Sequence, residues 1–299
     1  MSKPRIGITV GDPAGIGPEI SVKAAADPRV LEVCEPVLYG PHDAQALAAF
    51  TPGQLSAEAG RAAYQAIVTA VDDAQAGTID AIATAPINKE AFALAGIAFK
   101  GHTDLLADLT RSGPAVMMFH AEELRVVLAT VHVALREVPA LLTRELADFI
   151  IDITARELPR FGYPRPRMAF AGLNPHAGEH GVIGAEDDEV LRPAIEAARA
   201  RGIEIAGPLP ADTVFGRASR GDFDVVIACY HDQGLIPVKL LAFGRAVNVT
   251  LGLPIIRTSV DHGTAFDIAG KGIADHGSMV AAVLLAAKLA GKLQSTDHG

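Results

Sequence analysis

Short runs of β-branched and apolar residues alternate along the chain with longer segments in which apolar residues recur every three or four positions. Arg5 to Val10, Ile79 to Thr84 and Val225 to Tyr230 are runs of the length that buried strands have. Residues 56–77 and 143–161 show the periodicity of amphipathic helices. A regular alternation of strands and helices predicts an α/β fold with a largely parallel central sheet.

The same pattern continues through both halves of the chain. Further strands are expected at residues 37–39, 116–119, 125–131, 168–173, 203–205 and 247–251, and further helices at 17–26, 88–95, 187–201 and 278–293. The proline-rich stretch Gly162 to Pro166 is a candidate boundary between the two halves, which could also share one sheet. We therefore expect two α/β subdomains that divide near residue 164, with a cleft between them.

Composition narrows the class of protein. A hydrophobic content of 49% and a charged content of 20% are typical of a chain that folds. The formal net charge of -9 argues against nucleic acid as a partner, because a phosphate backbone requires a basic surface. The first residues lack the apolar core of a signal peptide, and the apolar run at 279–287 is too short to span a bilayer. We expect a cytoplasmic protein with no membrane partner.

Three histidines closely follow predicted strands: His132, His176 and His231. Ligands bind at the carboxyl ends of strands in an open α/β sheet, and three neutral imidazoles hold a divalent ion while leaving positions open for substrate. This pattern predicts a metal-assisted enzyme. The alternative is three unrelated loop histidines among the ten in the chain, since none of them shows the short spacing of a helical metal site. Asp212 and Asp232 are candidate carboxylates for orienting the imidazoles, although Asp212 could equally cap a helix or turn.

Two glycine-containing motifs lie in the first half of the chain. The turn Gly11 to Gly17 follows a strand and opens a helix, which suits either anion binding by backbone N–H groups or a tight strand-to-helix turn. Its spacing differs from the dinucleotide fingerprint G-x-G-x-x-G, so we expect any nicotinamide cofactor to bind elsewhere. In the second motif, His102 and Thr103 either contact substrate or simply begin a helix.

The last third of the chain carries candidate anion-binding and cofactor-binding residues. Lys239, Asn248 and Arg257 could hold a phosphate or carboxylate, whereas Arg245 is expected to be a solvated surface charge. The loop from residue 261 to 272 is punctuated by glycines and could surround an adenosine moiety, or be a plain surface loop. Its candidate cofactor contacts are Asp261, His262, Gly263, Thr264 and Asp267.

These motifs together resemble those of the 4-hydroxythreonine-4-phosphate dehydrogenases of pyridoxal phosphate biosynthesis. The matching stretches run in order over nearly the whole chain: residues 11–19, 101–103, 171–179, 207–213, 230–234, 247–254 and 257–264. The family is similar in turn to isocitrate and isopropylmalate dehydrogenases, which carry a comparable loop near the adenosine. The resemblance therefore implies their α/β/α architecture and NAD at residues 261–271.

Residue by residue, the resemblance implies a divalent metal (Zn, Mg or Co, often zinc) on the three histidines. It implies a homodimer whose active sites lie in the cleft at the subunit interface and share their ligands, with Asp212 and Asp232 maintaining the site. His102, Thr103, Lys239, Asn248 and Arg257 would hold a phosphorylated four-carbon hydroxy acid.

The implied reaction is oxidation of a secondary alcohol followed by decarboxylation. In pyridoxal phosphate biosynthesis it converts 4-phosphohydroxy-L-threonine into 3-amino-2-oxopropyl phosphate. Lys239 and Asp212 are both candidates for the general base. Between Gly40 and Gln54 the chain is shorter than the longer members of the family, which leaves D-threonate or D-erythronate 4-phosphate as alternative substrates. A metal-dependent hydrolase or acyltransferase without nicotinamide is a more distant alternative, and nothing in the chain favours a non-catalytic sensor.

Overall fold

The computed structural model describes residues 2–99 and 101–296, and the chain divides into two compact units. Unit 1 contains the residues up to Ala115 together with those from Val247 onward, and unit 2 contains Val116 to Ala246. The boundary expected near residue 164 is wrong, since that stretch lies inside unit 2. A local proline-rich break could not reveal that the chain returns to unit 1 for its last two strands and last helix.

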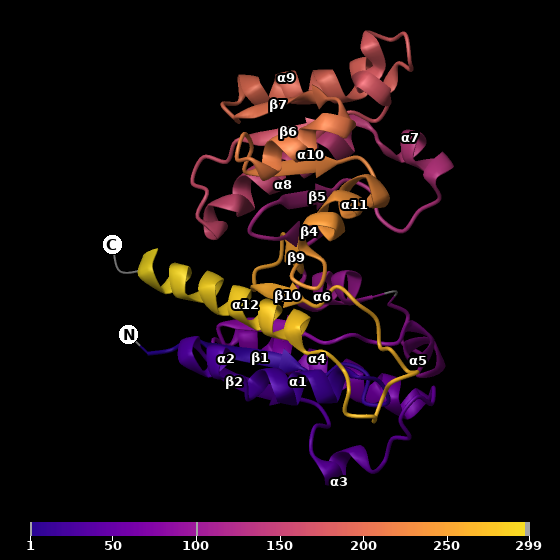
Figure 1. Cartoon of the computed structure of the whole chain (residues 1–299), viewed down its shortest axis with the longest axis vertical. Helices are drawn as coiled ribbons and strands as arrows, with labels where there is room; N and C mark the ends of the chain where they lie inside the picture. The colour runs from indigo at the N-terminus through magenta and orange to yellow at the C-terminus, as the bar shows by residue number, and fades with distance from the viewer. Residues whose placement is uncertain (1, 100, 297–299) are drawn as a thin grey trace. The chain divides into compact units, whose positions relative to one another are not determined.

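The sheet of unit 1 has the order β2-β1-β3-β10-β9, and its strands are parallel except for β9. They are β1 (Arg5–Thr9), β2 (Glu35–Tyr39), β3 (Ala81–Thr84), β9 (Val247–Leu251) and β10 (Arg257–Ser259). The helices on one face pack against one another and are α1 (Gly17–Ala25), α2 (Pro28–Val33) and α12 (Gly277–Thr296). The other face carries α4 (Ala57–Gln75), α5 (Lys89–Leu94) and α6 (His102–Thr110), and the short α3 (Ala44–Leu47) follows β2 (Figure 1).

The sheet of unit 2 has the order β4-β5-β8-β6-β7, with only β4 antiparallel to its neighbour. Its strands are β4 (Val116–His120), β5 (Arg125–Leu128), β6 (Met168–Ala171), β7 (Ile205–Leu209) and β8 (Val225–Ala228). Its helices are α7 (Val138–Leu141), α8 (Arg144–Glu157), α9 (Arg192–Ala200), α10 (Ala211–Ser219) and α11 (His231–Ala242). Short 3-10 or π turns lie at η1 (Leu135–Glu137), η2 (Leu158–Phe161), η3 (Pro175–Glu179) and η4 (Asp187–Leu191).

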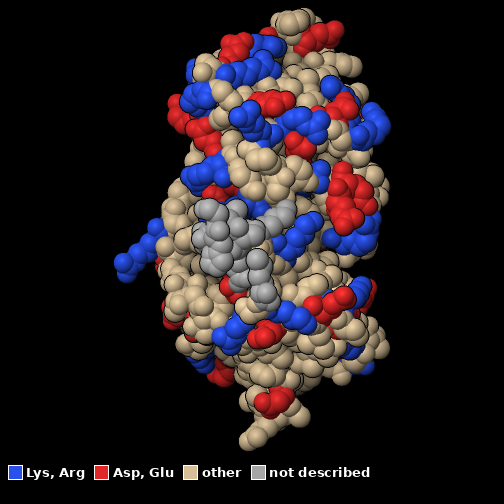
Figure 2. Space-filling view, turned by 90° about the vertical axis from the view of Figure 1, so that its left-hand side faces the viewer, with Lys and Arg blue, Asp and Glu red and all other residues tan. Residues whose placement is uncertain are grey.

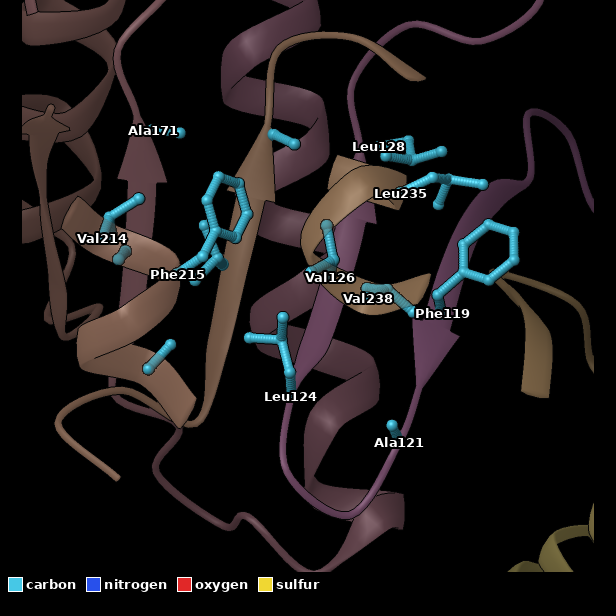
Figure 3. Packing of buried hydrophobic residues seen from close by; sticks show 14 of the residues in the cluster. Phe119, Ala121, Leu124, Val126, Leu128, Ala171, Val214, Phe215, Leu235 and Val238 are labelled. Carbon is cyan, nitrogen blue, oxygen red and sulfur yellow. The ribbon is translucent and has the colours of Figure 1, made fainter. Parts of the chain in front are cut away.

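A buried apolar cluster fixes α10 and α11 on the sheet of unit 2 (Figure 3). Leu235 and Val238 on α11 pack with Val126 and Leu128 of β5, and all four side chains are almost fully buried. Full burial of one such side chain stabilises the fold by about 1.5–3 kcal/mol. Because α11 begins directly after β8, this packing sets the position of the residues at its amino end.

The sequence pattern did not predict α11, because Gly234 and Pro237 both argue against a helix. The structure shows why a glycine is needed there. A Cβ atom on Gly234 would lie 2.6 Å from the Cδ2 atom of Leu128, so only glycine lets the helix approach β5 this closely. The predicted helix at 56–77 is confirmed as α4, and Ser56 caps it by accepting a hydrogen bond from the N–H of Ala59 (3.1 Å).

The turn between β1 and α1 also depends on close backbone approach. Gly11 has a positive φ of 68°, and a Cβ atom on it would lie 2.2 Å from the carbonyl oxygen of Pro86. A Cβ atom on Gly17 would lie 2.0 Å from the carbonyl oxygen of Val10. The two glycines therefore place the amino end of α1 directly against the end of β1.

No helix in the described ranges combines the length and the apolar character that a membrane span requires. On the face shown in Figure 2, acidic and basic side chains are interspersed. The net negative charge is therefore not gathered into one acidic patch on that face.

The substitution Gly17→Ala should lower the free energy of unfolding by roughly 1–3 kcal/mol, because the added methyl group must displace the carbonyl of Val10. Gly291→Ala is the matched control, since this helical glycine has no atom within 4 Å of its Cβ position, and alanine there should stabilise by about 0.5–1 kcal/mol. Urea unfolding followed by circular dichroism measures both. Equal stability of the two variants would contradict the close-packing argument.

Candidate functional site

Four parallel strands of unit 2 end at the same edge of its sheet, and a polar residue of predicted function follows each of them. His132 follows β5, His231 follows β8, His176 follows β6 and Asp212 follows β7. This edge is where ligands bind in sheets of this kind. The strand pairing thus agrees with the expectation that these segments belong to one region of the molecule.

His132 and His231 lie next to each other. Their ring centroids are 5.7 Å apart with an interplanar angle of 41°. Both line a cavity of about 230 Å³ together with Thr130, Val131, Val133, Leu135, Val138, Tyr230 and Asp232. The Nδ1 atom of His231 is 2.7 Å from Oδ1 of Asp232, so this nitrogen carries the proton that the carboxylate accepts. The Nε2 atom of His231 is then left as the atom that can bind a metal or a substrate group.

The paired imidazoles suit part of a metal site. Two neutral imidazoles, one of them oriented by a carboxylate, are typical ligands of first-row divalent ions. Within residues 2–99 and 101–296, however, no three His, Cys, Asp or Glu side chains converge closely enough to hold an ion. The structure thus brings together two of the three predicted ligands and does not join His176 to them.

His176 lies in a strained left-handed segment. Residues 176–181 all have positive φ, including 53° at His176 and 54° at Ala177. Left-handed helical geometry costs an L-residue about 1–2 kcal/mol, and such strain is concentrated at functional sites. The segment is held by the buried Asp187, whose carboxylate accepts hydrogen bonds from the N–H groups of Leu173 (2.8 Å) and Asn174 (3.0 Å). The backbone around His176 is therefore fixed before any ligand binds.

The three predicted catalytic residues of unit 2 lie on two helices. Asp212 is exposed in the first turn of α10, and Asp232 is exposed beside His231. Lys239 is half-buried on α11, eight residues after His231 and thus about 12 Å along the helix axis. Of these, Asp232 is hydrogen-bonded to the predicted ligand His231, and the choice of base between Asp212 and Lys239 stays open.

In unit 1, Arg257 is a buried cation that is bound only to neutral groups. It is 2% exposed and donates hydrogen bonds to the hydroxyl oxygens of Thr84 (2.7 Å from Nη2) and Thr250 (2.9 Å). No carboxylate of the described residues forms an ion pair with it. Burial lowers its pKa below the ordinary range. A buried guanidinium without a counter-charge is unfavourable, and a bound anion removes that penalty.

His102 and Asn248 accompany this cation. His102 begins α6, and burial, with the charge of Arg257 in addition, holds the pKa of His102 well below its ordinary value. The Nε2 atom of His102 and the Oδ1 atom of Asn248 are buried and have no hydrogen-bond partner within the described residues. Thr103 follows directly on the same helix, half-buried. The guanidinium and the neutral imidazole suit a phosphate or carboxylate, while the Oδ1 acceptor of Asn248 suits a hydroxyl or ammonium group beside it. Arg245, in contrast, is exposed and paired with Glu123 (3.0 Å).

The predicted cofactor loop follows β10 and packs on the glycine-rich turn. The carbonyl of Thr264 accepts a hydrogen bond from the N–H of Ile16 (3.0 Å), while His262, Gly263 and Asp267 are exposed. Asp261 is half-buried at the start of the loop. The loop therefore presents its polar residues to solvent, and its contact with an adenosine moiety stays a prediction.

The glycine-rich turn itself is not free to bind an anion. The N–H groups of Asp12, Gly15 and Ile16 donate to carbonyl oxygens of the protein, and that of Ala14 donates to Oδ1 of Asp12 (2.9 Å). Burial raises the pKa of Asp12, which the N–H of Ala14 partly offsets. These contacts favour the interpretation of this segment as a tight strand-to-helix turn.

Sequence reasoning missed several residues that hold the site together. Thr84 and Thr250 bind Arg257 through pairings between strands, which no local pattern reveals. Asp187 lies in a run of acidic residues, a pattern that is typical of the solvent-exposed start of a helix. Gln233 bridges two loops, and its place within the matching stretch at residues 230–234 was the available signal.

Comparison with known proteins shows the family to which the chain belongs. The family model for pyridoxal phosphate biosynthetic protein PdxA matches residues 18–286. A 4-hydroxythreonine-4-phosphate dehydrogenase from Desulforapulum autotrophicum is 45% identical over 336 residues, covering 100% of this chain and 97% of the relative. A D-threonate 4-phosphate dehydrogenase from Cupriavidus necator is 45% identical over 324 residues, covering 96% of this chain and 97% of the relative.

Solved structures agree. The crystal structure of 4-hydroxythreonine-4-phosphate dehydrogenase from Klebsiella pneumoniae has a TM-score of 0.88 and 41% identity, covering 96% of this chain and 98% of that one. Isocitrate dehydrogenase from Methylococcus capsulatus shares the fold, with a TM-score of 0.52 and 19% identity, covering 99% of this chain and 88% of that one. This likeness confirms the predicted fold class. The chain belongs to the family of pyridoxal phosphate biosynthetic protein PdxA, whose members named here are dehydrogenases.

Proposed function

We propose that the protein oxidises the secondary alcohol of a phosphorylated four-carbon hydroxy acid with NAD and then releases CO2. The substrate we propose first is 4-phosphohydroxy-L-threonine, with 3-amino-2-oxopropyl phosphate as product. The observation that carries the proposal is the pair His132 and His231 in a cavity at the carboxyl edge of the unit 2 sheet, in a member of a dehydrogenase family. A hydrolase or acyltransferase finds no support in the relatives, which are named dehydrogenases.

The phosphate or carboxylate of the substrate is assigned to the buried cation of unit 1. Arg257 offers a guanidinium that has no counter-charge among the described residues, and His102 and Asn248 offer polar atoms without partners. The guanidinium of Arg257 and a protonated Nε2 of His102 can each donate a hydrogen bond to the anion, so the affinity arises from removing unfavourable burial as well as from the charge. The Oδ1 atom of Asn248 is an acceptor and would instead take a hydrogen bond from a hydroxyl or ammonium group of the substrate. Thr103 and Lys239 are further candidates for contacts with the same substrate.

His132 and His231 are the residues we propose to hold a divalent metal, with His176 as the third ligand. Such an ion would supply a Lewis acid that makes the reacting hydroxyl easier to deprotonate. Asp232 orients His231 and keeps its proton on Nδ1. Lys239 or Asp212 would accept the proton of the alcohol. The loop from residue 261 to 267 would position the adenosine part of NAD, so that the nicotinamide can accept hydride.

A second candidate substrate is D-threonate 4-phosphate, or its erythronate isomer. One observation favours keeping it. The relative named for that substrate is as similar to this chain as the relative named for the amino acid, since each is 45% identical. The reaction is the same in both cases, and the substituent beside the reacting carbon differs.

Zinc-loaded protein should form NADH with either 4-phosphohydroxy-L-threonine or D-threonate 4-phosphate, each offered separately and followed by NADH absorbance. Turnover of the amino acid alone would support a role in vitamin B6 synthesis, and turnover of the sugar acid alone would support a catabolic role. His231→Ala should lose about 100-fold in activity, because one of the paired imidazoles is removed and the carboxylate of Asp232 has no ligand left to orient.

His42→Ala is the control for this substitution, since His42 is exposed in unit 1 and binds only the carbonyl of Gly40. It should retain the activity of the unaltered protein. Near-normal turnover by His231→Ala would contradict the role of the paired imidazoles. Absence of turnover with both substrates and NAD would contradict the proposed reaction.

Inorganic phosphate should stabilise the protein, and Arg257→Met should remove that effect. At a phosphate concentration about 100 times Kd, linkage gives a gain of about 2.7 kcal/mol in the free energy of unfolding. Thermal shift with increasing phosphate measures it at constant ionic strength. Arg201→Met is the control, because Arg201 is an exposed arginine paired with Asp152 (2.6 Å). Equal phosphate responses in all three proteins would show that Arg257 does not bind the anion.

We also propose that the protein is a homodimer and that the metal ligands are shared between its subunits. One chain brings together only two of the three predicted ligands. An exposed apolar stripe runs from Ile236 and Leu240 of helix α11 to Phe243, which lies directly after the last residue of the helix, and Leu240 and Phe243 are each 81% exposed. Residues spaced by four and three lie on one face of a helix, and a second copy of the chain would bury this stripe.

The substitution Leu240→Glu should shift the protein from dimer to monomer and lower its zinc affinity, because the shared ligand set is then lost. Sedimentation velocity gives the oligomeric state, and competition with a chromophoric chelator gives the affinity. Leu94→Glu is the control, since Leu94 is an exposed apolar residue of unit 1 (58%). A monomeric unaltered protein that still binds zinc tightly would refute the shared site.

A further inference from the structure

The backbone of Cys229 connects the segments that carry His132 and His231. Its carbonyl accepts hydrogen bonds from the N–H (3.2 Å) and the hydroxyl (2.8 Å) of Thr130. Its own N–H donates to Oε1 of Gln233 (2.7 Å). Thr130 precedes His132 by two residues, and Cys229 precedes His231 by two residues. The two imidazoles are thus held at their separation by hydrogen bonds that end on Cys229.

Gln233 extends this connection to the segment of His176. Its Nε2 atom donates to the carbonyl of Gly172 (2.8 Å), the first residue after β6. The thiol of Cys229 also donates to the carbonyl of Ala171 (3.3 Å). From Gly172 the chain runs directly into residues 173 and 174, which Asp187 fixes as described above. One side chain therefore links the loop after β8 to the loop after β6.

Glutamine suits this position because both ends of its amide are used. The oxygen accepts from the backbone of Cys229 while the nitrogen donates to the backbone of Gly172. Glutamate has no donor for the carbonyl of Gly172, and an apolar residue of the same length has neither group. Gln233 is in the first turn of α11, so the amide at the end of its side chain reaches back to the strand end from which the helix starts.

We propose that Gln233 is a positioning residue, which sets the spacing between the His132–His231 pair and the His176 segment and thereby the metal affinity of the site. The proposal rests on the proposed function for the metal itself. It holds whether the three ligands come from one subunit or from two. In a symmetric dimer both subunits have the same Gln233 contacts, so these contacts position the ligands of both sites. Residues beyond the ligands that orient them typically change metal affinity by about 10–100-fold.

The test compares Gln233→Met, Gln233→Glu and the control Gln65→Met in the full-length protein. Gln65 is an exposed glutamine of α4, so its replacement makes the same chemical change away from the site. Zinc affinity is measured by competition with a chromophoric chelator, and hydrogen exchange by mass spectrometry on peptides covering residues 168–182 and 228–236. Gln233→Met should bind zinc about 10–100-fold more weakly and exchange faster in both peptides, while Gln65→Met matches the unaltered protein. Gln233→Glu should speed hydrogen exchange in the peptide at 168–182 more than in the one at 228–236. Glutamate still accepts a hydrogen bond from the N–H of Cys229 but has no donor for the carbonyl of Gly172.

Unchanged zinc affinity in Gln233→Met, with tight binding by the unaltered protein, would overturn the proposal and leave the metal site standing. If the unaltered protein binds no zinc, the proposed metal site is contradicted, and so is the proposed effect of Gln233 on metal affinity. Hydrogen exchange then tests whether Gln233 fixes the two loops. Unchanged exchange in Gln233→Met would refute this role as well. Should Gln233→Met not fold, Thr130→Val removes the hydroxyl bond to Cys229 at nearly constant volume, and the same two measurements apply.

Discussion

Parallel pairing of strands is the constraint on which the rest of this structure depends. In unit 2, pairing of β5, β8, β6 and β7 in one direction brings the residues after each strand to one edge. The histidines that we assign to the metal all follow these apolar strands, whereas in unit 1 Arg257 and Asn248 lie within β10 and β9. In unit 1 the same constraint places the glycine-rich turn after β1 and the predicted cofactor loop after β10 at one edge. The backbone contact between Thr264 and Ile16 follows from it.

The folded chain keeps several features that are unfavourable by themselves. Arg257 is buried without a counter-charge among the described residues, and buried atoms of His102 and Asn248 have no partner there. Residues 176–181 stay in left-handed geometry although most of them are not glycine. Natural sequences tolerate such features where a ligand or a reaction requires them, and the surrounding core supplies the stability that holds them. Their concentration in the segments that sequence motifs had singled out is the strongest physical argument that both regions bind ligands.

The sequence alone predicted the class of fold, most strands and the residues after them, because short apolar runs and polar strand ends are local signals. It did not predict α11, since Gly234 and Pro237 are unfavourable in helices and only the approach to Leu128 explains the glycine. It also placed the domain boundary near residue 164, because the return of β9 and β10 to unit 1 is a long-range pairing. The groups that support the candidate sites, such as Thr84, Asp187 and Gln233, act through contacts between distant segments and left little trace in the local pattern.

The relatives define the class of reaction better than the substrate, because they are named as dehydrogenases of two different phosphorylated acids. The two candidate acids share the phosphate, the carboxylate and the reacting hydroxyl, which are the groups assigned to Arg257 and to the pair of imidazoles. They differ in an amine or a hydroxyl on the neighbouring carbon. Nitrogen and oxygen there are both acceptable to a divalent ion held by imidazoles. The carboxylate of Asp232, which could favour a cationic amine, is already bound to His231. Discrimination must therefore come from side chains that approach this carbon from outside the pair.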